Sequence, residues 1–130
     1  MGRTFLAMLA LLAVASPARA QMPFGGQQQA APPNPAALFR NQCGTCHTTE
    51  PGAAPRQGPN LAGIYQRPAG KVPGFKYSAG FAGRDFVWDD ARLDAWLTNP
   101  QAMIPGSVMV YRQASPATRR AIIDWLKEQH

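Results

Sequence analysis

The stretch Cys43-Gly44-Thr45-Cys46-His47 decides how the rest of this 130-residue chain is interpreted. Two thiols three residues apart are followed directly by an imidazole, which is the C-x-x-C-H pattern of covalent c-type haem attachment. On one helical turn the three side chains occupy positions i, i+3 and i+4 and project from nearly the same face. Two thioether bonds from Cys43 and Cys46 and an iron ligand from His47 can therefore reach one porphyrin. The sequence predicts one covalently bound haem c.

Three other uses of a cysteine pair fit this sequence less well. A disulfide between such close neighbours would close almost no loop and would stabilise little. A thioredoxin-like redox pair needs a βαβ context, and no strand-like run precedes the motif. A zinc site needs more thiols or imidazoles than the two cysteines, His47 and His130 provide. These comparisons favour haem attachment.

The first twenty residues predict a cleaved secretory signal peptide. Arg3 supplies a short positive region, the residues from Phe5 to Val14 form an apolar run, and Ala18-Arg19-Ala20 is an A-x-A cleavage site. The apolar run is too short to cross about 30 Å of hydrocarbon as a helix, which argues against a membrane anchor. We expect a mature chain that begins at Gln21 and resides in the periplasm, because haem attachment of this kind takes place outside the cytoplasm.

The mature chain of about 110 residues is predicted to contain a tether and one domain. Residues 21–35 are rich in Gln, Ala, Pro and Gly and predict a disordered tether, and residues 36–130 form the predicted domain. A chain of this size has little apolar mass for a core of its own, so a buried haem is expected to complete the core. We therefore expect the apo-protein to be poorly folded.

The net charge of the chain is positive but moderate. Removing Arg3 and Arg19 with the signal peptide lowers the formal net charge from +6 to +4. A basic excess of this size can steer a protein towards acidic partners, and it permits peripheral contact with a membrane surface. The sequence contains no basic run and no alternation of basic with aromatic residues, so nucleic acid is not an expected partner.

The local pattern predicts an all-α fold, with three main helices and long loops around one haem. Three segments carry helix signals, namely a first that begins at Pro35 or Ala36, a second that Asp89-Asp90 caps and Pro100 stops, and a last that begins at Ser115-Pro116. Residues 48–74 are dense in Gly and Pro and predict an extended loop. A short helical turn is expected over residues 78–83.

The ligand on the second face of the iron decides the function. A methionine sulfur favours electron transfer, whereas an open position permits ligand chemistry. Beyond the signal peptide the methionines are Met22, Met103 and Met109. Met22 lies in the tether, and Met103 follows the helix stop closely and suits packing. Met109 ends a proline-stiffened loop that turns at Gly106, and spacing alone ranks it only modestly above Met103.

Four segments, in this order, resemble the class I (mitochondrial-type) cytochromes c: Cys43–His47, Gly58-Pro59-Asn60-Leu61, Gly74-Phe75-Lys76-Tyr77 and the loop Asn99–Met109. With Trp88 and the terminal helix, the resemblance covers about residues 38–127. It implies the small cytochrome c fold. It also implies that His47 and Met109 are the two axial ligands of the iron, because Met109 is the methionine of the family's I-P-G-[TS]-x-M loop.

The resemblance assigns roles to residues around the haem as well. It implies that the carbonyl oxygen of Pro59 accepts the proton on Nδ1 of His47. The residues that it places as hydrogen-bond donors to the haem propionates are Arg67, Tyr77, Trp88 and Ser107. It also implies that Phe39 locks the first helix against the last, with Ile122 and Trp125 as its partners.

The chain departs from this family at several positions. Trp96 replaces a tyrosine near the axial sulfur, and Phe81 replaces an asparagine beside the inner propionate. The positions where lysines commonly surround the haem edge are occupied by Gln101, Ala102 and Val108. We therefore expect partner docking to depend less on lysine. The arginines that could take over are Arg112, Arg119 and Arg120.

The favoured function is a soluble periplasmic monohaem electron carrier, a monomer and not an enzyme. The expected donors are a quinol-oxidising complex or a dehydrogenase, and the expected acceptors are a terminal oxidase or reductase. The first alternative is a dedicated electron-accepting subunit of one periplasmic dehydrogenase. The second is a haem enzyme or gas sensor in which Met109 dissociates from the iron.

Overall fold

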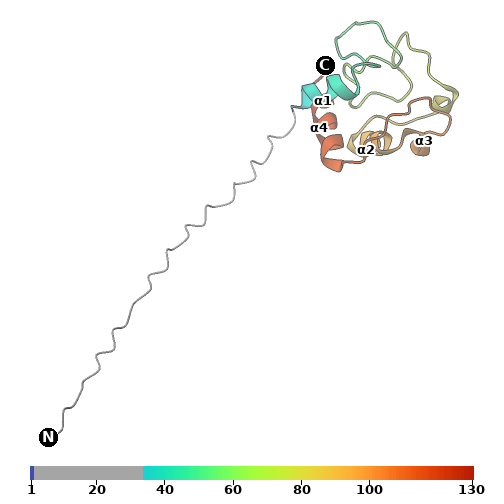
Figure 1. Ribbon diagram of the computed structural model, residues 1–130. Coiled ribbons are helices and arrows are strands. Elements are labelled where there is room, and N and C mark those ends of the chain that lie inside the picture. The colour runs from blue at the N-terminus through green and yellow to red at the C-terminus, as the bar shows by residue number, and fades with distance from the viewer. Residues whose placement is uncertain (2–33) are drawn as a thin grey trace. The chain divides into compact units, whose positions relative to one another are not determined.

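The computed structural model describes Met1 and residues 34–130 of the chain. The predicted signal peptide and nearly all of the predicted tether fall on residues 2–33 and lie outside the described residues. Between residues 34 and 130 the chain forms helices joined by long loops and contains no strand (Figure 1). This agrees with the all-α prediction. No helix in this part of the chain is both long enough and apolar enough to cross a membrane.

Helix α1 spans Pro35–Gln42 and carries the haem motif at its end. Asn34 caps it, because its side-chain oxygen accepts hydrogen bonds from the N–H groups of Ala36 at 3.0 Å and Ala37 at 3.2 Å. Helix α1 thus begins one residue before the predicted start of the domain at residue 36. The chain then continues in hydrogen-bonded turns, and the N–H of His47 donates to the carbonyl oxygen of Cys43 at 2.9 Å. The three motif residues therefore share one turn.

Helix α2 spans Asp90–Thr98, and its buried residues Leu93 and Leu97 face the core. The side chain of Asp89 caps it by accepting from the N–H of Arg92 at 2.8 Å. Pro100 ends α2, as predicted, but it also opens a short helix, α3 (Pro100–Met103), that the sequence did not predict. Proline suits the first helical position, where its missing N–H leaves no bond unmade.

Helix α4 spans Pro116–Lys127 and packs against both α1 and α2 (Figure 1). The Ser115 side chain caps it by accepting from the N–H of Thr118 at 3.2 Å. The ring centroids of Phe39 and Trp125 lie 4.5 Å apart in a stacked arrangement, which confirms the predicted lock between the first and last helices. Ile122 is fully buried in the same core.

Loops fill the space between α1 and α2 and bring distant segments to one site. The 3-10 helix η1 (Ala79–Phe81) forms where a short helical turn was expected. An isolated bridge pairs Pro68 with Val87. Gly80 lies against the turn at Gly106, since a Cβ on Gly80 would meet the carbonyl oxygen of Pro105 at 2.5 Å. The contact at Gly80 holds residues 75–81, which we call the 75–81 loop, beside the loop Asn99–Met109, which we call the Met109 loop.

Candidate haem site

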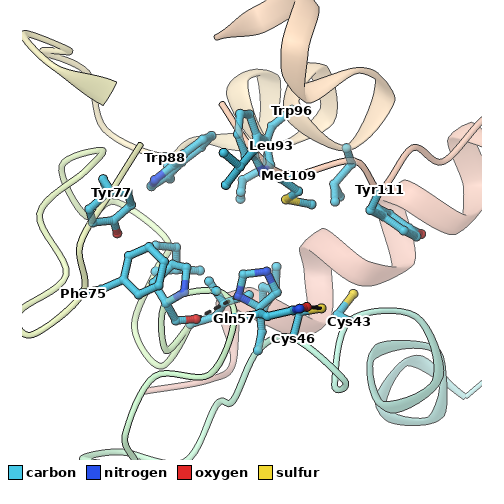
Figure 2. A pocket seen from close by; sticks show the side chains of 18 of the residues that line it. Cys43, Cys46, Gln57, Phe75, Tyr77, Trp88, Leu93, Trp96, Met109 and Tyr111 are labelled. Atoms are coloured by element: carbon cyan, nitrogen blue, oxygen red, sulfur yellow. Dashed lines mark hydrogen bonds between the residues drawn. The ribbon is translucent and has the colours of Figure 1, made fainter. Parts of the chain in front are cut away.

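A cavity of about 630 Å³ lies between the haem motif, the 75–81 loop, α2 and the Met109 loop (Figure 2). Its lining is mostly apolar, and Lys76 is the one described lining residue with a permanent charge. Figure 2 shows Cys43 and Cys46 on one side, with Met109, Leu93 and Trp96 on the other. A cavity of this volume and polarity is typical of a cofactor site.

Cys43 and Cys46 line the cavity as free thiols, half-buried, with no disulfide between them. The Sγ of Cys46 lies 3.0 Å from Oε1 of Gln57, which accepts its hydrogen bond. Burial, helped by the neighbouring thiol of Cys46, raises the pKa of Cys43 to about 11. Both side chains therefore sit beside an apolar space, as covalent attachment of a porphyrin requires.

The imidazole of His47 is held by a bond to the backbone. Its Nδ1 lies 2.8 Å from the carbonyl oxygen of Pro59, which confirms the predicted contact. A carbonyl oxygen can only accept, so Nδ1 carries the proton and Nε2 keeps its lone pair for a metal. Burial lowers the pKa of His47, and the bond to Pro59 opposes this shift. The neutral imidazole is the form that binds iron.

Gly58 is required by the position of this ring. A Cβ on Gly58 would lie between 2.2 and 2.7 Å from three atoms of the His47 imidazole. Real Cβ atoms do not approach other atoms so closely, so any side chain would displace the ring or the loop. The Gly58-Pro59 pair therefore provides both the close approach and the acceptor that orient His47.

The Met109 loop brings one of the candidate methionines to the cavity. Ile104, at the start of the turn, is fully buried, and Gly106 takes a positive φ of 83° that suits glycine. Met109 lines the cavity, whereas Met103 is half-buried and lies outside the lining. Met22 lies outside the described residues. The geometry thus distinguishes Met109 from Met103, which spacing alone did not.

Among the other predicted site residues, Pro59, Tyr77 and Trp88 line the cavity, but Arg67 does not. Arg67 instead donates from Nη2 to the carbonyl oxygen of Ala62 at 2.6 Å. Trp88 is buried, and burial raises the pKa of the Tyr77 phenol. Seven of the nine residues predicted to bind or support the haem therefore line one cavity, and Arg67 and Ser107 do not.

Four aromatic side chains that line the cavity contact one another in series, and we call them the aromatic wall: Tyr77, Phe81, Trp96 and Trp88. Phe81 is its centre, with its ring centroid 4.8 Å from Tyr77 and 5.6 Å from Trp96, and Trp96 lies 5.6 Å from Trp88. The two departures from the family, Phe81 and Trp96, thus contact each other edge to face. Edge-to-face contact is a favoured arrangement of aromatic rings.

The cavity fits a haem on an observation independent of its size. The hydroxyl of Ser107 is buried and makes no hydrogen bond among the described residues. A buried polar group without a partner is costly, so this hydroxyl calls for an acceptor or donor that the chain itself does not supply. Ser107 does not itself line the cavity but directly precedes Val108, which does, so the bond from Ser107 to a haem propionate stays a prediction. The two thiols and the neutral imidazole that line the cavity are the donor set of a covalently held haem.

Prediction from the sequence did not identify Gln42 and Gln57, two polar residues of the cavity lining. The phenol of Tyr111 donates to Oε1 of Gln42, and Nε2 of Gln113 donates to the same oxygen at 3.0 Å. No local pattern could reveal these contacts, because Gln42 lies about 70 residues from its partners in the chain.

Two of the arginines proposed as docking residues are engaged elsewhere. Arg119 is buried, and its Nε donates to Asp94 at 2.7 Å. Its Nη1 donates to the carbonyl oxygen of Gln113 at 2.9 Å, so this arginine supports the core and not a docking surface. Arg120 is exposed but pairs with Asp90 and Asp124. The expectation that Arg119 replaces a docking lysine is therefore wrong.

A helical domain that surrounds an apolar cavity with two thiols and a backbone-bound imidazole defines a covalent haem protein. A family model described as cytochrome c matches residues 34–130. Cytochrome c of Sesamum indicum is 39% identical over 92 residues, which cover 70% of this chain and 83% of the relative. Cytochrome c of Ginkgo biloba is 36% identical over 104 residues, with 77% and 92% covered. Cytochrome c-550 of Novispirillum itersonii is 39% identical over 101 residues, with 69% and 91% covered.

The chain belongs to the cytochrome c family. It binds one haem c covalently through Cys43 and Cys46. Members of this family carry electrons between redox partners and are not enzymes, and this chain is accordingly a cytochrome c electron carrier.

Proposed function

We propose that the protein is a soluble periplasmic monohaem carrier whose iron is held between His47 and Met109. One observation carries this proposal. His47 and Met109 line the same apolar cavity, and Met109 lies across it from the attachment cysteines (Figure 2). A thioether as the second axial ligand favours electron transfer and raises the reduction potential, whereas an open position would permit ligand chemistry.

The chain's own residues would keep this site closed and rigid. When bound, the haem supplies an iron that exchanges one electron between its ferrous and ferric states. Pro59 fixes the tautomer and the orientation of His47. The aromatic wall would exclude water from the side of the cavity that it lines. Tyr77 and Trp88 offer an O–H and an N–H donor to buried haem carboxylates, which need such partners.

Absorption spectroscopy combined with a redox titration of the purified holoprotein tests this proposal. The proposal predicts a low-spin spectrum, the weak far-red band of iron–methionine ligation and a positive reduction potential. Met109→Ala should abolish the far-red band and open the site to carbon monoxide. If the wild-type protein already binds carbon monoxide readily at neutral pH, the protein is a ligand-binding haem protein and the carrier proposal fails.

The periplasmic location rests on the predicted signal peptide, residues 1–20. The bacterial cytochrome c-550 among the relatives is consistent with an exported protein. Mass spectrometry of the protein from a periplasmic extract provides the test. We expect an N-terminus at Gln21 and a mass that includes one haem. An intact N-terminal segment on a protein that remains in the cytoplasm would contradict the proposed location.

The partners would be a quinol-oxidising complex or a dehydrogenase as donor and a terminal oxidase or reductase as acceptor. One observation favours the alternative of a dedicated dehydrogenase subunit. Val108 and Val110 flank Met109 and are 77% and 79% exposed, which is unusual for two apolar side chains in one short segment. Stoichiometric co-purification with one enzyme would support the subunit. A freely exchanging monomer would support the carrier.

A further inference from the structure

The segment that carries Met109 is weakly held by its own backbone. The N–H of Ser107 bonds to the carbonyl oxygen of Ile104 at 3.1 Å, and the N–H of Gln113 bonds to that of Leu97 at 2.8 Å. Between these two points, residues 108–112 make no backbone hydrogen bond with any described residue. The position of Met109 therefore depends on side-chain contacts and on the two ends of this segment.

Three polar side chains connect the segment to the end of α1. The phenol of Tyr111 donates to Oε1 of Gln42, and Nε2 of Gln113 donates to the same oxygen at 3.0 Å and lies 3.2 Å from the phenol oxygen. Gln42 is the last residue of α1 and directly precedes Cys43. Figure 2 shows Tyr111 at the same end of the cavity as Cys43. We call Gln42, Tyr111 and Gln113 the Gln42 clamp.

The far end of the clamp is fixed to the rest of the fold. The carbonyl oxygen of Gln113 accepts from the buried Arg119 at 2.9 Å, and its side-chain oxygen accepts from the N–H of Ser115 at 3.0 Å. Gln113 is therefore immobilised beside α4, and Gln42 is immobilised at the end of α1. Tyr111, two residues after Met109, is held between them. Movement of Met109 out of the cavity would pull on this hydrogen-bonded group.

We propose that Gln42, Tyr111 and Gln113 are positioning residues that hold Met109 in the cavity and set how readily another ligand replaces it. This inference rests on the proposed ligation of the iron by Met109. We assign Gln42 and Tyr111, which both line the cavity, an effect on the position of Met109 and no bond to the iron. Each hydrogen bond in it contributes the modest net free energy of an ordinary intramolecular bond, so its loss changes an exchange equilibrium by about two- to tenfold.

Titration of the ferric holoprotein with imidazole tests the clamp, with loss of the far-red iron–methionine band as the readout. Tyr111→Phe keeps the ring and removes the hydroxyl, and we expect it to raise the apparent affinity for imidazole about two- to tenfold. Gln42→Leu removes the acceptor and should act in the same direction. Gln42→Glu keeps an acceptor oxygen of the same reach and should remain close to the wild type. The double variant Gln42→Leu/Tyr111→Phe should show less than the sum of the two effects.

Tyr65→Phe is the matched control, because Tyr65 lies outside the cavity lining and its ring contacts Lys127 instead. It removes the same hydroxyl elsewhere in the fold and should leave the imidazole affinity unchanged. The proposed role of the clamp is overturned if the wild type shows the band but Tyr111→Phe and Gln42→Leu titrate like the wild type. It is also overturned if Tyr65→Phe raises the affinity for imidazole as much as Tyr111→Phe does. If the wild-type protein lacks the band, the proposed ligation fails and the clamp fails with it. If Tyr111→Phe does not fold, the contrast between Gln42→Leu and Gln42→Glu decides.

Discussion

The carbonyl oxygen of Pro59 lies 2.8 Å from Nδ1 of His47, and this contact determines which nitrogen of the ring is available to iron. The acceptor comes from a loop twelve residues further along the chain. The imidazole is thus oriented by backbone, and the turn that carries the two cysteines need only deliver it to the cavity. Metal-binding histidines are commonly oriented through the second nitrogen in this way.

Gly58→Ala should disrupt this orientation. The new methyl group would lie 2.2 Å from Cε1 of His47, so the ring or the loop must move. We expect a lower yield of holoprotein and loss of the low-spin spectrum, measured by absorption and by haem content. Gly52→Ala is the control for a glycine-to-alanine change without a clash. Its positive φ of 77° strains the backbone, but its new methyl group has no neighbour within 4 Å. A normal spectrum in Gly58→Ala would show that the contact is not needed.

Arg119 and Arg120 are adjacent arginines that should differ sharply in their effect on stability. The Arg119 side chain is 10% exposed and bonds to Asp94 and two carbonyl groups, so Arg119→Met should lower the free energy of unfolding by about 2–4 kcal/mol. The Arg120 side chain is 61% exposed, and Arg120→Met should cost less than about 1 kcal/mol. Guanidinium denaturation of the holoproteins measures both. Equal effects would contradict the structural role of Arg119.

The cap of α2 predicts a pH dependence that Asp89→Asn removes. The N–H of Arg92 holds the pKa of the Asp89 carboxyl below its usual value of 3.8. A lowered pKa in the folded state means that the charged carboxylate stabilises the fold above the unfolded value, and that this contribution is lost as the pH falls through the lowered pKa. Asparagine still accepts the capping bond but does not titrate.

We therefore expect wild type to melt at a higher temperature than Asp89→Asn near neutral pH, with a difference that declines below pH 3.8 and is lost once the pH has fallen through the lowered pKa. Thermal unfolding of both holoproteins between neutral pH and strong acid gives this difference. A difference that stays constant over the whole range would mean that the charge of Asp89 contributes nothing.

The exposed valines predict that docking depends little on salt. Among the described residues, Lys76 is the one permanently charged member of the cavity lining, and Val108 and Val110 are largely exposed beside Met109. On gold electrodes coated with methyl-terminated thiols, we expect adsorption and electron exchange that change little with ionic strength, because apolar contact is not screened. Val108→Asp/Val110→Asp should weaken this adsorption.

Val87→Asp is the matched control for this experiment. Val87 is also exposed, at 36%, but does not line the cavity. The Val87→Asp variant should adsorb like the wild type. Preferential adsorption of the wild-type protein on carboxylate-terminated surfaces, abolished by moderate salt, would show instead that basic residues dominate docking.

The sequence was most informative where the chemistry is local. Cys43, Cys46 and His47 share one turn, so their spacing alone predicted the attachment site, and capping residues located the three main helices. Helix α3 was missed because Pro100 both stops one helix and opens the next. The resemblance to the class I cytochromes c, not spacing, selected Met109 over Met103.

Contacts between distant segments could not be predicted in the same way. The bond from Tyr111 to Gln42 joins residues 69 positions apart, and nothing in the local pattern of either residue announces it. Arg119 was expected to replace a docking lysine, but its guanidinium is buried and paired with the carboxylate of Asp94. The sequence also gave no sign that Arg67 would turn to the carbonyl oxygen of Ala62.

Proton NMR of the ferrous holoprotein can detect directly whether Met109, opposite His47, is bound to the haem iron. A methionine methyl group bound to haem iron lies over the porphyrin and gives a strongly upfield-shifted three-proton signal. We predict this signal in the wild type and in Met103→Leu, and its loss in Met109→Leu. Its absence from the wild type, or its persistence in Met109→Leu, would show that Met109 is not a ligand of the iron.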